Sequence, residues 1–201
     1  MNVAVLVSGS GTNLQAILDA QKAGALGSAR VVVVVSNVAG VRALERAAAA
    51  GVPTEIMPHK QFASREAFDQ ALVATLKKHG VELVALAGFM RLLTPGFLAA
   101  FPQRVMNIHP ALLPAFPGVH SQKQALDYGA RVTGCTVHFV DEGCDTGPII
   151  AQAAVSVLDG DDEAALTARI LAEEHRLYPA AIRAVADGRV RVAGRRVTIA
   201  S

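Results

Sequence analysis

The chain has 201 residues, 52% of them hydrophobic and 18% charged, and its formal net charge at pH 7 is +2. This length and apolar content fit one domain with a single buried core. Acidic and basic residues are interspersed, which argues against nucleic acid or an anionic membrane as the main partner and favours small-molecule substrates. The sequence lacks a basic leader, and its apolar runs Val3–Val7 and Val31–Val35 are too short for a signal sequence or a membrane span, so we expect a cytoplasmic protein.

The first half of the chain alternates apolar runs rich in β-formers with alanine-rich helical segments. This alternation predicts an α/β fold in which a mostly parallel, twisted sheet lies between layers of helices on both faces. Ligands of such sheets bind beyond the carboxyl ends of the strands. The predicted strands are Met1–Val7, Arg30–Ser36, Thr54–Met57 and Glu82–Ala87, and the predicted helices are Asn13–Ala23, Val41–Ala50 and Ser64–His79.

The pattern changes after the segment Arg104–His109. Prolines and glycine predict a long irregular loop from Pro110 to Gly118. Two β-rich segments follow, Arg131–Val140 and Ile149–Val157, and the turn that joins them predicts antiparallel additions to the sheet.

The last part of the chain predicts one long helix and a hairpin. The helix covers Asp162–Asp187 and should be interrupted before Pro179, because proline lacks the N–H that a helix interior needs. Valines and arginines alternate around Ala193–Arg195, which predicts a small hairpin with a solvated edge. Because no linker or repeat separates these segments, we expect a single domain over residues 1–201.

The turn after the first strand is rich in glycine, and residues 8–13 read SGSGTN. The turn opens the first helix, where backbone N–H groups and the helix dipole favour an anion. Leu14 stands where a dinucleotide-binding fingerprint needs glycine, and the lysine of a P-loop is absent. We therefore interpret the turn as a site for the phosphate monoester of a small substrate. The alternative is an ordinary tight turn in which Thr12 or Asn13 only caps the helix.

Residues 88–93 read GFMRLL and follow the fourth strand at the same end of the sheet. Their apolar groups could line a slot for a flat heterocycle, with backbone groups binding the ring edge. The alternative is ordinary loop packing with a solvated Arg91.

Asn107, His109 and the distant Asp145 are the candidate catalytic residues. Pro110 favours an extended backbone at His109, so Asn107 and His109 should point to the same side at a strand end. An amide and an imidazole can bind an oxyanion and carry a proton, which suggests transfer chemistry at a carbonyl. If Asp145 meets His109, the carboxylate would raise the pKa of the imidazole. The alternatives are a structural histidine and an Asx turn.

A metal site and a redox site are the other readings of the reactive side chains. His109, His120, His138 and Asp145 lack the spacing that marks zinc sites, so we expect no metal. The only thiols, at residues 135 and 144, are too far apart for a redox pair, and we expect both to be reduced.

Together these motifs, in their order and spacing, resemble the phosphoribosylglycinamide formyltransferase family of folate-dependent enzymes. The resemblance covers essentially the whole chain and includes Leu112–Pro114, Glu174–His175 and Tyr178–Pro179. It implies a Rossmann-like formyltransferase fold in which the N-terminal half binds phosphate and the C-terminal half binds folate and catalyses. It also implies transfer of a formyl group from 10-formyltetrahydrofolate, as co-substrate, to the amine of phosphoribosylglycinamide, without a metal.

The resemblance implies roles for individual residues. Asn107 would lie beside the formyl group, His109 would donate a proton, and Asp145 would raise the pKa of His109. The chain departs from the family at Ala111, where serine is common, and at Gln122, where histidine is common. The residues implied for the nucleotide are Gly11, Thr12, Asn13 and Glu174, and those for folate are Arg65, Met90, Arg91, Leu92, Leu93 and Asn107.

Several alternatives share this catalytic core. Formyltetrahydrofolate hydrolases and methionyl-tRNA formyltransferases resemble it, but the phosphate turn favours transfer over hydrolysis, and the length and charge favour a free nucleotide over tRNA. A non-catalytic folate or nucleotide-binding module would not need the reactive trio. The sequence leaves open whether the protein is a monomer or a homodimer, and whether the loop Asp141–Thr146 becomes ordered when folate binds.

Overall fold

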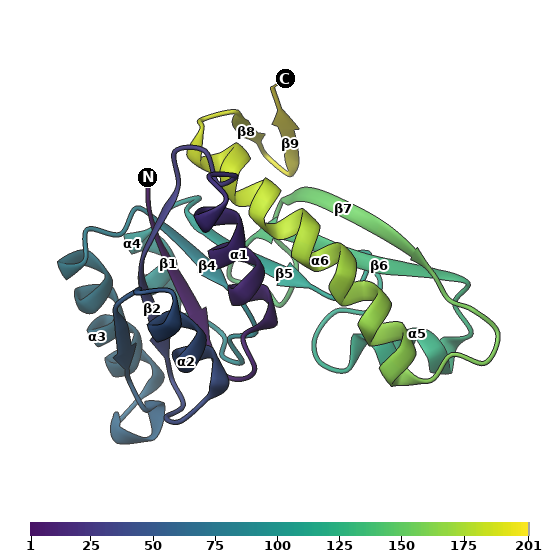
Figure 1. Ribbon diagram of the computed structural model, residues 1–201, viewed down its shortest axis with the longest axis horizontal. Helices are drawn as coiled ribbons and strands as arrows, with labels where there is room; N and C mark the ends of the chain where they lie inside the picture. Colours follow the sequence, from purple (N-terminus) through teal and green to yellow (C-terminus); the bar gives the residue numbers. More distant parts are fainter. Residues whose placement is uncertain (201) are drawn as a thin grey trace.

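Seven strands form one twisted sheet at the centre of the computed structural model, which describes residues 1–200 (Figure 1). The strand order is β3-β2-β1-β4-β5-β6-β7. Neighbouring strands from β3 to β5 are parallel, β6 pairs antiparallel with β5, and β7 pairs antiparallel with β6, so the antiparallel additions are as predicted. The strands are β1 (Asn2–Val7), β2 (Arg30–Ser36), β3 (Thr54–Ile56), β4 (Leu83–Leu86), β5 (Val105–His109), β6 (Val132–Phe139) and β7 (Ile149–Ser156).

Helices cover both faces of the sheet, which confirms the three-layer prediction. On one face lie α1 (Thr12–Lys22), α2 (Arg42–Ala49) and α6 (Glu163–Ala186), and Figure 1 shows α6 running beside α1. On the other lie α3 (Arg65–Lys78) and α4 (Pro95–Ala100). The remaining helices are η1 (His59–Gln61) and α5 (Ser121–Tyr128).

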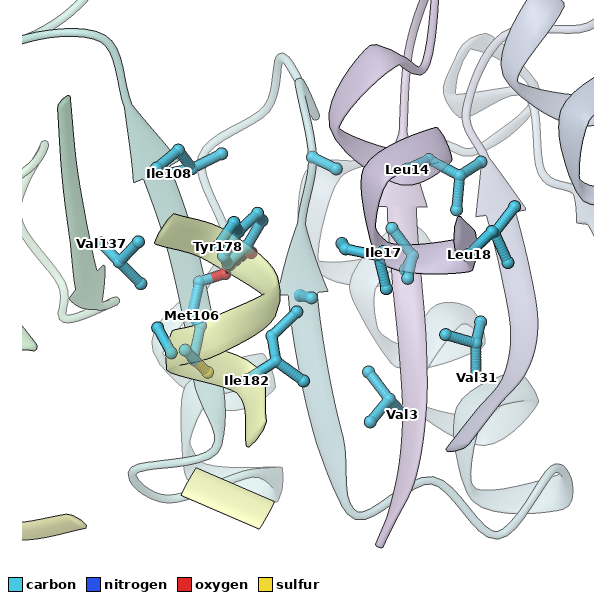
Figure 2. Packing of buried hydrophobic residues seen from close by; sticks show 14 of the residues in the cluster. Val3, Leu14, Ile17, Leu18, Val31, Met106, Ile108, Val137, Tyr178 and Ile182 are labelled. Carbon is cyan, nitrogen blue, oxygen red and sulfur yellow. Dashed lines mark hydrogen bonds between the residues drawn. The ribbon is translucent and has the colours of Figure 1, made fainter. Parts of the chain in front are cut away.

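The core is divided between these two faces by the period of the strands. Along β1, Val3, Val5 and Val7 face α1 and α6, whereas Ala4 and Leu6 face α3 and α4. Successive strand side chains point to opposite faces, so a strand that is apolar throughout must be covered on both sides. Figure 2 shows the α1 and α6 side, where Ile17, Tyr178 and Ile182 pack over the strands.

One predicted feature is wrong: α6 is not interrupted before Pro179 and continues from Glu163 to Ala186. A proline removes one helical hydrogen bond and strains the preceding turn at a cost of about 3 kcal/mol. The buried face around Pro179, which includes Tyr178, Ile182 and Val185, offsets this cost by packing against the sheet. The short helices η1, α4 and α5 were not predicted.

The chain ends in the predicted hairpin, which forms a separate sheet from β8 (Val190–Ala193) and β9 (Arg196–Ile199). Its turn reaches the loop before β7, where the guanidinium of Arg195 donates to the carbonyl of Thr146 at 2.8 Å. Within residues 1–200, no helix combines the length and apolar character that a membrane crossing needs.

The strand order places a topological switch point between β1 and β4. From β1 the chain first builds the sheet outward through β2 and β3, and then returns to the other side of β1 with β4 and β5. The loops that leave two such neighbouring strands diverge, which creates a crevice beyond their carboxyl ends. Here those loops are the glycine-rich turn after Val7 and the segment after Leu86.

Candidate active site

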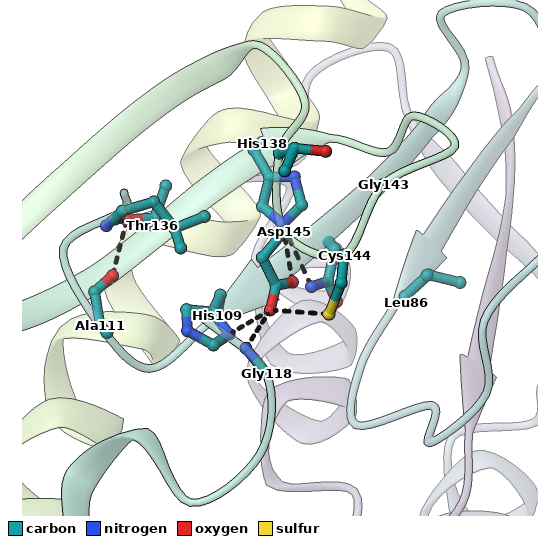
Figure 3. Close-up of polar contacts among 12 residues, drawn as sticks. Leu86, His109, Ala111, Gly118, Thr136, His138, Gly143, Cys144 and Asp145 are labelled. Carbon is teal, nitrogen blue, oxygen red and sulfur yellow. Dashed lines mark hydrogen bonds and ion pairs between the residues drawn. The ribbon is translucent and has the colours of Figure 1, made fainter. Parts of the chain in front are cut away.

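Four polar side chains from β5, β6 and the loop before β7 meet at the carboxyl edge of the sheet. Asn107 and His138 are paired across the β5–β6 ladder, and their side chains face each other at 3.2 Å between Asn107 Nδ2 and His138 Nε2. Asp145 lies against both histidines, with Oδ2 at 3.3 Å from His109 Nδ1 and Oδ1 at 3.6 Å from His138 Nε2. Figure 3 shows the two imidazoles on either side of this carboxylate. The predicted trio therefore converges.

Asp145 is held in place by the backbone around it. Its own backbone is left-handed, with φ of 56°, and Oδ2 accepts a hydrogen bond of 2.8 Å from the N–H of Gly118. Burial alone would raise the pKa of Asp145, but the contact with His138, the Gly118 N–H and the charge of His109 outweigh it and lower the pKa to about 2. The carboxylate therefore stays ionised near neutral pH.

His109 is nearly fully buried, and both of its ring nitrogens face acceptors. Nδ1 faces Asp145, and Nε2 lies 2.8 Å from the carbonyl oxygen of Phe116. A neutral imidazole has only one N–H, whereas the doubly protonated ring donates to both acceptors. Both ring nitrogens of His109 are therefore engaged within the chain, and Nε2 can turn to another acceptor only when the carbonyl of Phe116 moves away.

His138 is the member of this cluster that the sequence did not identify, except as part of a rejected metal site. Its Nδ1 faces the carbonyl of Phe139 at 2.9 Å and therefore carries a hydrogen, while Nε2 lies between the Asn107 amide and Oδ1 of Asp145. Without a hydrogen, Nε2 accepts one N–H of the Asn107 amide; with a hydrogen, it donates to Asp145. The signal that could have identified His138 is its β6 register, which depends on the pairing of β6 with β5.

The other histidine of that hypothetical metal set lies outside the cluster. His120 is exposed at the residue before α5. In the described part of the chain, no three His, Cys, Asp or Glu side chains gather in a way that could hold a metal ion. At the two departures from the family pattern, the carbonyl of Ala111 accepts a 2.7 Å hydrogen bond from Thr136, and Gln122 accepts one of 3.3 Å from Ser121.

The glycine-rich turn has the geometry of an anion site at the start of α1. Gly11 precedes the helix with φ of 71°, and a Cβ at this position would lie 2.6 Å from Cβ of Ala43. Neither Thr12 nor Asn13 caps the helix through its side chain; the amide of Asn13 instead donates to Glu174 at 2.7 Å. The N–H groups of this first turn therefore remain available to an anion.

Glu174 lies on the face of α6 that covers the sheet, and only 4% of its surface is exposed. Burial raises its pKa to about 7, and the hydrogen bond from Asn13 opposes this rise. The pair links the phosphate turn to α6, although Asn13 and Glu174 are 161 residues apart in sequence.

The segment 88–93 lies between the phosphate turn and the catalytic cluster, because β4 pairs with β1 on one side and with β5 on the other. Met90 and Leu92 expose 68% and 59% of their surface, which leaves two apolar side chains open to a ligand. Arg91 is not fully solvated, since its guanidinium lies 4.9 Å from the ring centre of Phe68. Leu93 is buried in the core, so its side chain is not part of an open slot.

The structure places the last predicted folate residue, Arg65, exposed at the start of α3, the helix that also carries Phe68. Phe68 lies three residues after Arg65, and the guanidinium of Arg91 stacks over its ring. Both arginines therefore lie on the α3 side of the segment 88–93.

The loop Asp141–Thr146 carries Asp145 and has its own hydrogen bonds. Oδ1 of Asp141 accepts from the hydroxyl of Thr146 at 2.6 Å and from the N–H of Gly143 at 3.2 Å. A Cβ at Gly147 would collide with the carbonyl oxygen of Phe139. The chain at Gly147 therefore packs closely against the end of β6, and the loop is hydrogen-bonded to the hairpin through Arg195.

Comparisons with known proteins agree with this geometry. The family model described as formyl transferase matches residues 1–182. The phosphoribosylglycinamide formyltransferase of Escherichia coli K12 is 46% identical over 193 residues, which cover 96% of this chain and 90% of that protein. A trifunctional purine biosynthetic protein of Drosophila pseudoobscura is 54% identical over 190 residues, 94% of this chain, but the match spans only 14% of its length.

A solved structure has the same fold over the full length. The crystal structure of glycinamide ribonucleotide transformylase 1 from Symbiobacterium toebii is 56% identical and superposes with a TM-score of 0.98, covering 100% of this chain and 94% of that one. Similarity at this level extends to the sheet edge that carries the candidate site.

Proposed function

The chain belongs to the formyl transferase family, and on this premise we propose that it transfers the formyl group of 10-formyltetrahydrofolate to the amine of phosphoribosylglycinamide in purine biosynthesis. The observation that carries the proposal is the convergence of Asn107, His109 and Asp145 at a sheet edge next to an anion site. Residues 1–201 would act as one formyltransferase domain. The relatives named phosphoribosylglycinamide formyltransferase support this assignment over nearly their whole length.

The nucleotide would bind at the start of α1. Its phosphate would accept hydrogen bonds from the N–H groups of Gly11, Thr12 and Asn13, where the helix dipole adds positive potential. Glu174, hydrogen-bonded to Asn13, would contact the sugar. This placement directs the glycinamide amine from the β1 loop toward the end of β5.

The folate would bind along the segment 88–93. The exposed side chains of Met90 and Leu92 would cover its ring system, while Arg65 and Arg91 would lie toward its carboxylates. Leu93 would contribute through its backbone, since its side chain is in the core. Asn107 on β5 is paired with Leu86, the last residue of β4, and this register would bring the formyl group to the cluster.

The chemistry needs an oxyanion site and a proton route. The lone pair of the neutral amine attacks the formyl carbon, a C–N bond forms, and the carbonyl electrons move onto oxygen. Asn107 and cationic His109 would donate to this oxyanion, and for His109 Nε2 to do so the carbonyl of Phe116 must give way. The intermediate then collapses as the bond to the folate nitrogen breaks and that nitrogen gains the proton lost by the amine. Ionised Asp145 would stabilise the imidazolium throughout.

A competition assay tests the proposal. The protein would be given 10-formyltetrahydrofolate together with phosphoribosylglycinamide, water alone, or aminoacylated initiator tRNA as the acceptor, and the formylated products would be separated. We expect the nucleotide to be formylated in preference to the tRNA, with little free formate. Predominant release of formate would support the hydrolase alternative, and folate binding with no turnover for any acceptor would support a binding module.

A further inference from the structure

The hydroxyl of Ser8 connects the phosphate turn to the folate segment. Its oxygen accepts a hydrogen bond of 3.0 Å from the backbone N–H of Met90, and its hydrogen is donated to Oδ1 of Asn37 at 2.6 Å. Asn37, only 4% exposed, lies at the end of β2, and its amide nitrogen is 3.2 Å from Nδ1 of His59. These contacts join the loops after β1, β2, β3 and β4 at one edge of the sheet.

The direction of the Ser8 hydroxyl is fixed by Asn37. A hydroxyl has one hydrogen and two lone pairs, so donation to Asn37 leaves a lone pair for the N–H of Met90. The Ser8–Met90 bond crosses the switch point between β1 and β4, where the two loops diverge.

The segment 88–93 has no other backbone anchor in the described chain. The residues that flank the segment are both hydrogen-bonded. The N–H of Ala87 donates to the carbonyl of Leu6, and the N–H of Thr94 donates to the carboxylate of Asp69. Between these points, only one backbone group of residues 88–93 makes a hydrogen bond within the described residues 1–200. This group is the N–H of Met90, which donates to Ser8. Gly88, with φ of 72°, adds a turn that few other residues adopt readily.

We propose that Ser8, although it belongs to the phosphate turn, is a positioning residue for the folate segment. By holding the N–H of Met90, its hydroxyl fixes the course of residues 88–93 and with it the placement of the side chains of Met90 and Leu92 against the folate ring. This inference rests on the proposed function, because it assigns the segment to folate. It has an asymmetric consequence: a change in the phosphate turn should weaken folate binding more than nucleotide binding.

The test compares Ser8→Ala with Ser156→Ala, its matched control. Ser156 is an exposed serine at the end of β7, outside both proposed binding sites, and its hydroxyl makes no hydrogen bond within the described residues. The loss of one hydrogen bond should raise the Kd of Ser8→Ala for 10-formylfolate, the oxidised analogue of the co-substrate, about fivefold to tenfold. Its Kd for phosphoribosylglycinamide, and both constants of Ser156→Ala, should stay within about twofold of wild type.

Two further variants and one ligand-free measurement complete the test. Ser8→Thr keeps the hydroxyl and should restore folate binding, and Asn37→Ala frees the hydroxyl and should weaken it less than Ser8→Ala does. Without any ligand, hydrogen exchange of the Met90 N–H should be faster in Ser8→Ala than in wild type.

The outcomes separate the two proposals. If wild type binds 10-formylfolate and Ser8→Ala binds it equally well, or loses nucleotide affinity to the same extent, the positioning role is wrong while the proposed function stands. If wild type binds no folate, the proposed function fails and this inference fails with it.

Discussion

Asn107 and His138 face each other across β5 and β6, so that Nδ2 of the amide lies 3.2 Å from Nε2 of the ring. The ring is itself oriented by the carbonyl of Phe139. An amide held in this way keeps its second N–H directed at one place, which lowers the reorganisation needed when an oxyanion forms. The pair explains how a single β5 side chain can serve as a fixed donor.

The pairing of His138 with Asn107 should contribute to turnover. His138→Ala should lower kcat about tenfold, the value of one lost hydrogen bond, while leaving the KM for the nucleotide nearly unchanged. Steady-state kinetics with each substrate varied would measure it. His79→Ala is the control, because His79 pairs with Glu55 away from the cluster. A KM effect without a kcat effect would show that His138 serves binding instead.

Removal of either proposed oxyanion donor should have a larger effect. Asn107→Ala or His109→Ala should raise the barrier by about 3 kcal/mol and slow turnover at least about a hundredfold. Single-turnover rates at saturating substrates measure the chemical step without product release. Near-normal rates in both variants would remove these residues from the mechanism.

Asp145 should make stability sensitive to acid. Its folded pKa is about 2, below the ordinary 3.8, so its ionised form stabilises the fold above pH 3.8 and this contribution is lost as pH falls toward 2. The difference in unfolding free energy between wild type and Asp145→Asn should therefore shrink by about 2 kcal/mol on acidification across this range. Urea unfolding at several pH values measures it. A constant difference would contradict the lowered pKa.

Glu174 should act in the opposite sense. Its folded pKa of about 7 is above the ordinary 4.5, so the folded state binds the proton more tightly and wild type loses stability as pH rises from 4.5 to 7. Glu174→Gln cannot ionise and should gain up to about 3 kcal/mol relative to wild type over this interval. Glu173→Gln, its neighbour paired with Arg176 at the surface, should show no such trend. Parallel curves for all three proteins would refute the assignment.

The hairpin should steady the loop that carries Asp145. Arg195→Ala removes the donor to the carbonyl of Thr146 and should speed hydrogen exchange in the loop Asp141–Thr146 severalfold. Arg196→Ala removes the same charge one residue along and should leave the loop unchanged. Adding 10-formylfolate should slow exchange there in wild type if folate orders the loop. Equal exchange in the two variants would mean that the hairpin has no part in holding it.

Local sequence determined much of this protein. Strand and helix positions followed from hydrophobic periodicity, which is set by neighbours a few residues apart, and apolar runs such as Val31–Val35 required a sheet covered on both faces. The two-residue spacing of Asn107 and His109 placed both at one strand end. The meeting of His109 with Asp145 was predicted as a condition and is confirmed by the 3.3 Å between Nδ1 and Oδ2.

Only the tertiary structure decided the contacts between segments far apart in sequence. His138 joins the cluster through the β5–β6 register, Ser8 holds Met90 across the switch point, and Arg195 reaches back to Thr146. The continuity of α6 through Pro179 likewise depends on packing against the sheet. Periodicity and turn residues report the environment of each segment, whereas register and loop approach are fixed by how all segments pack at once.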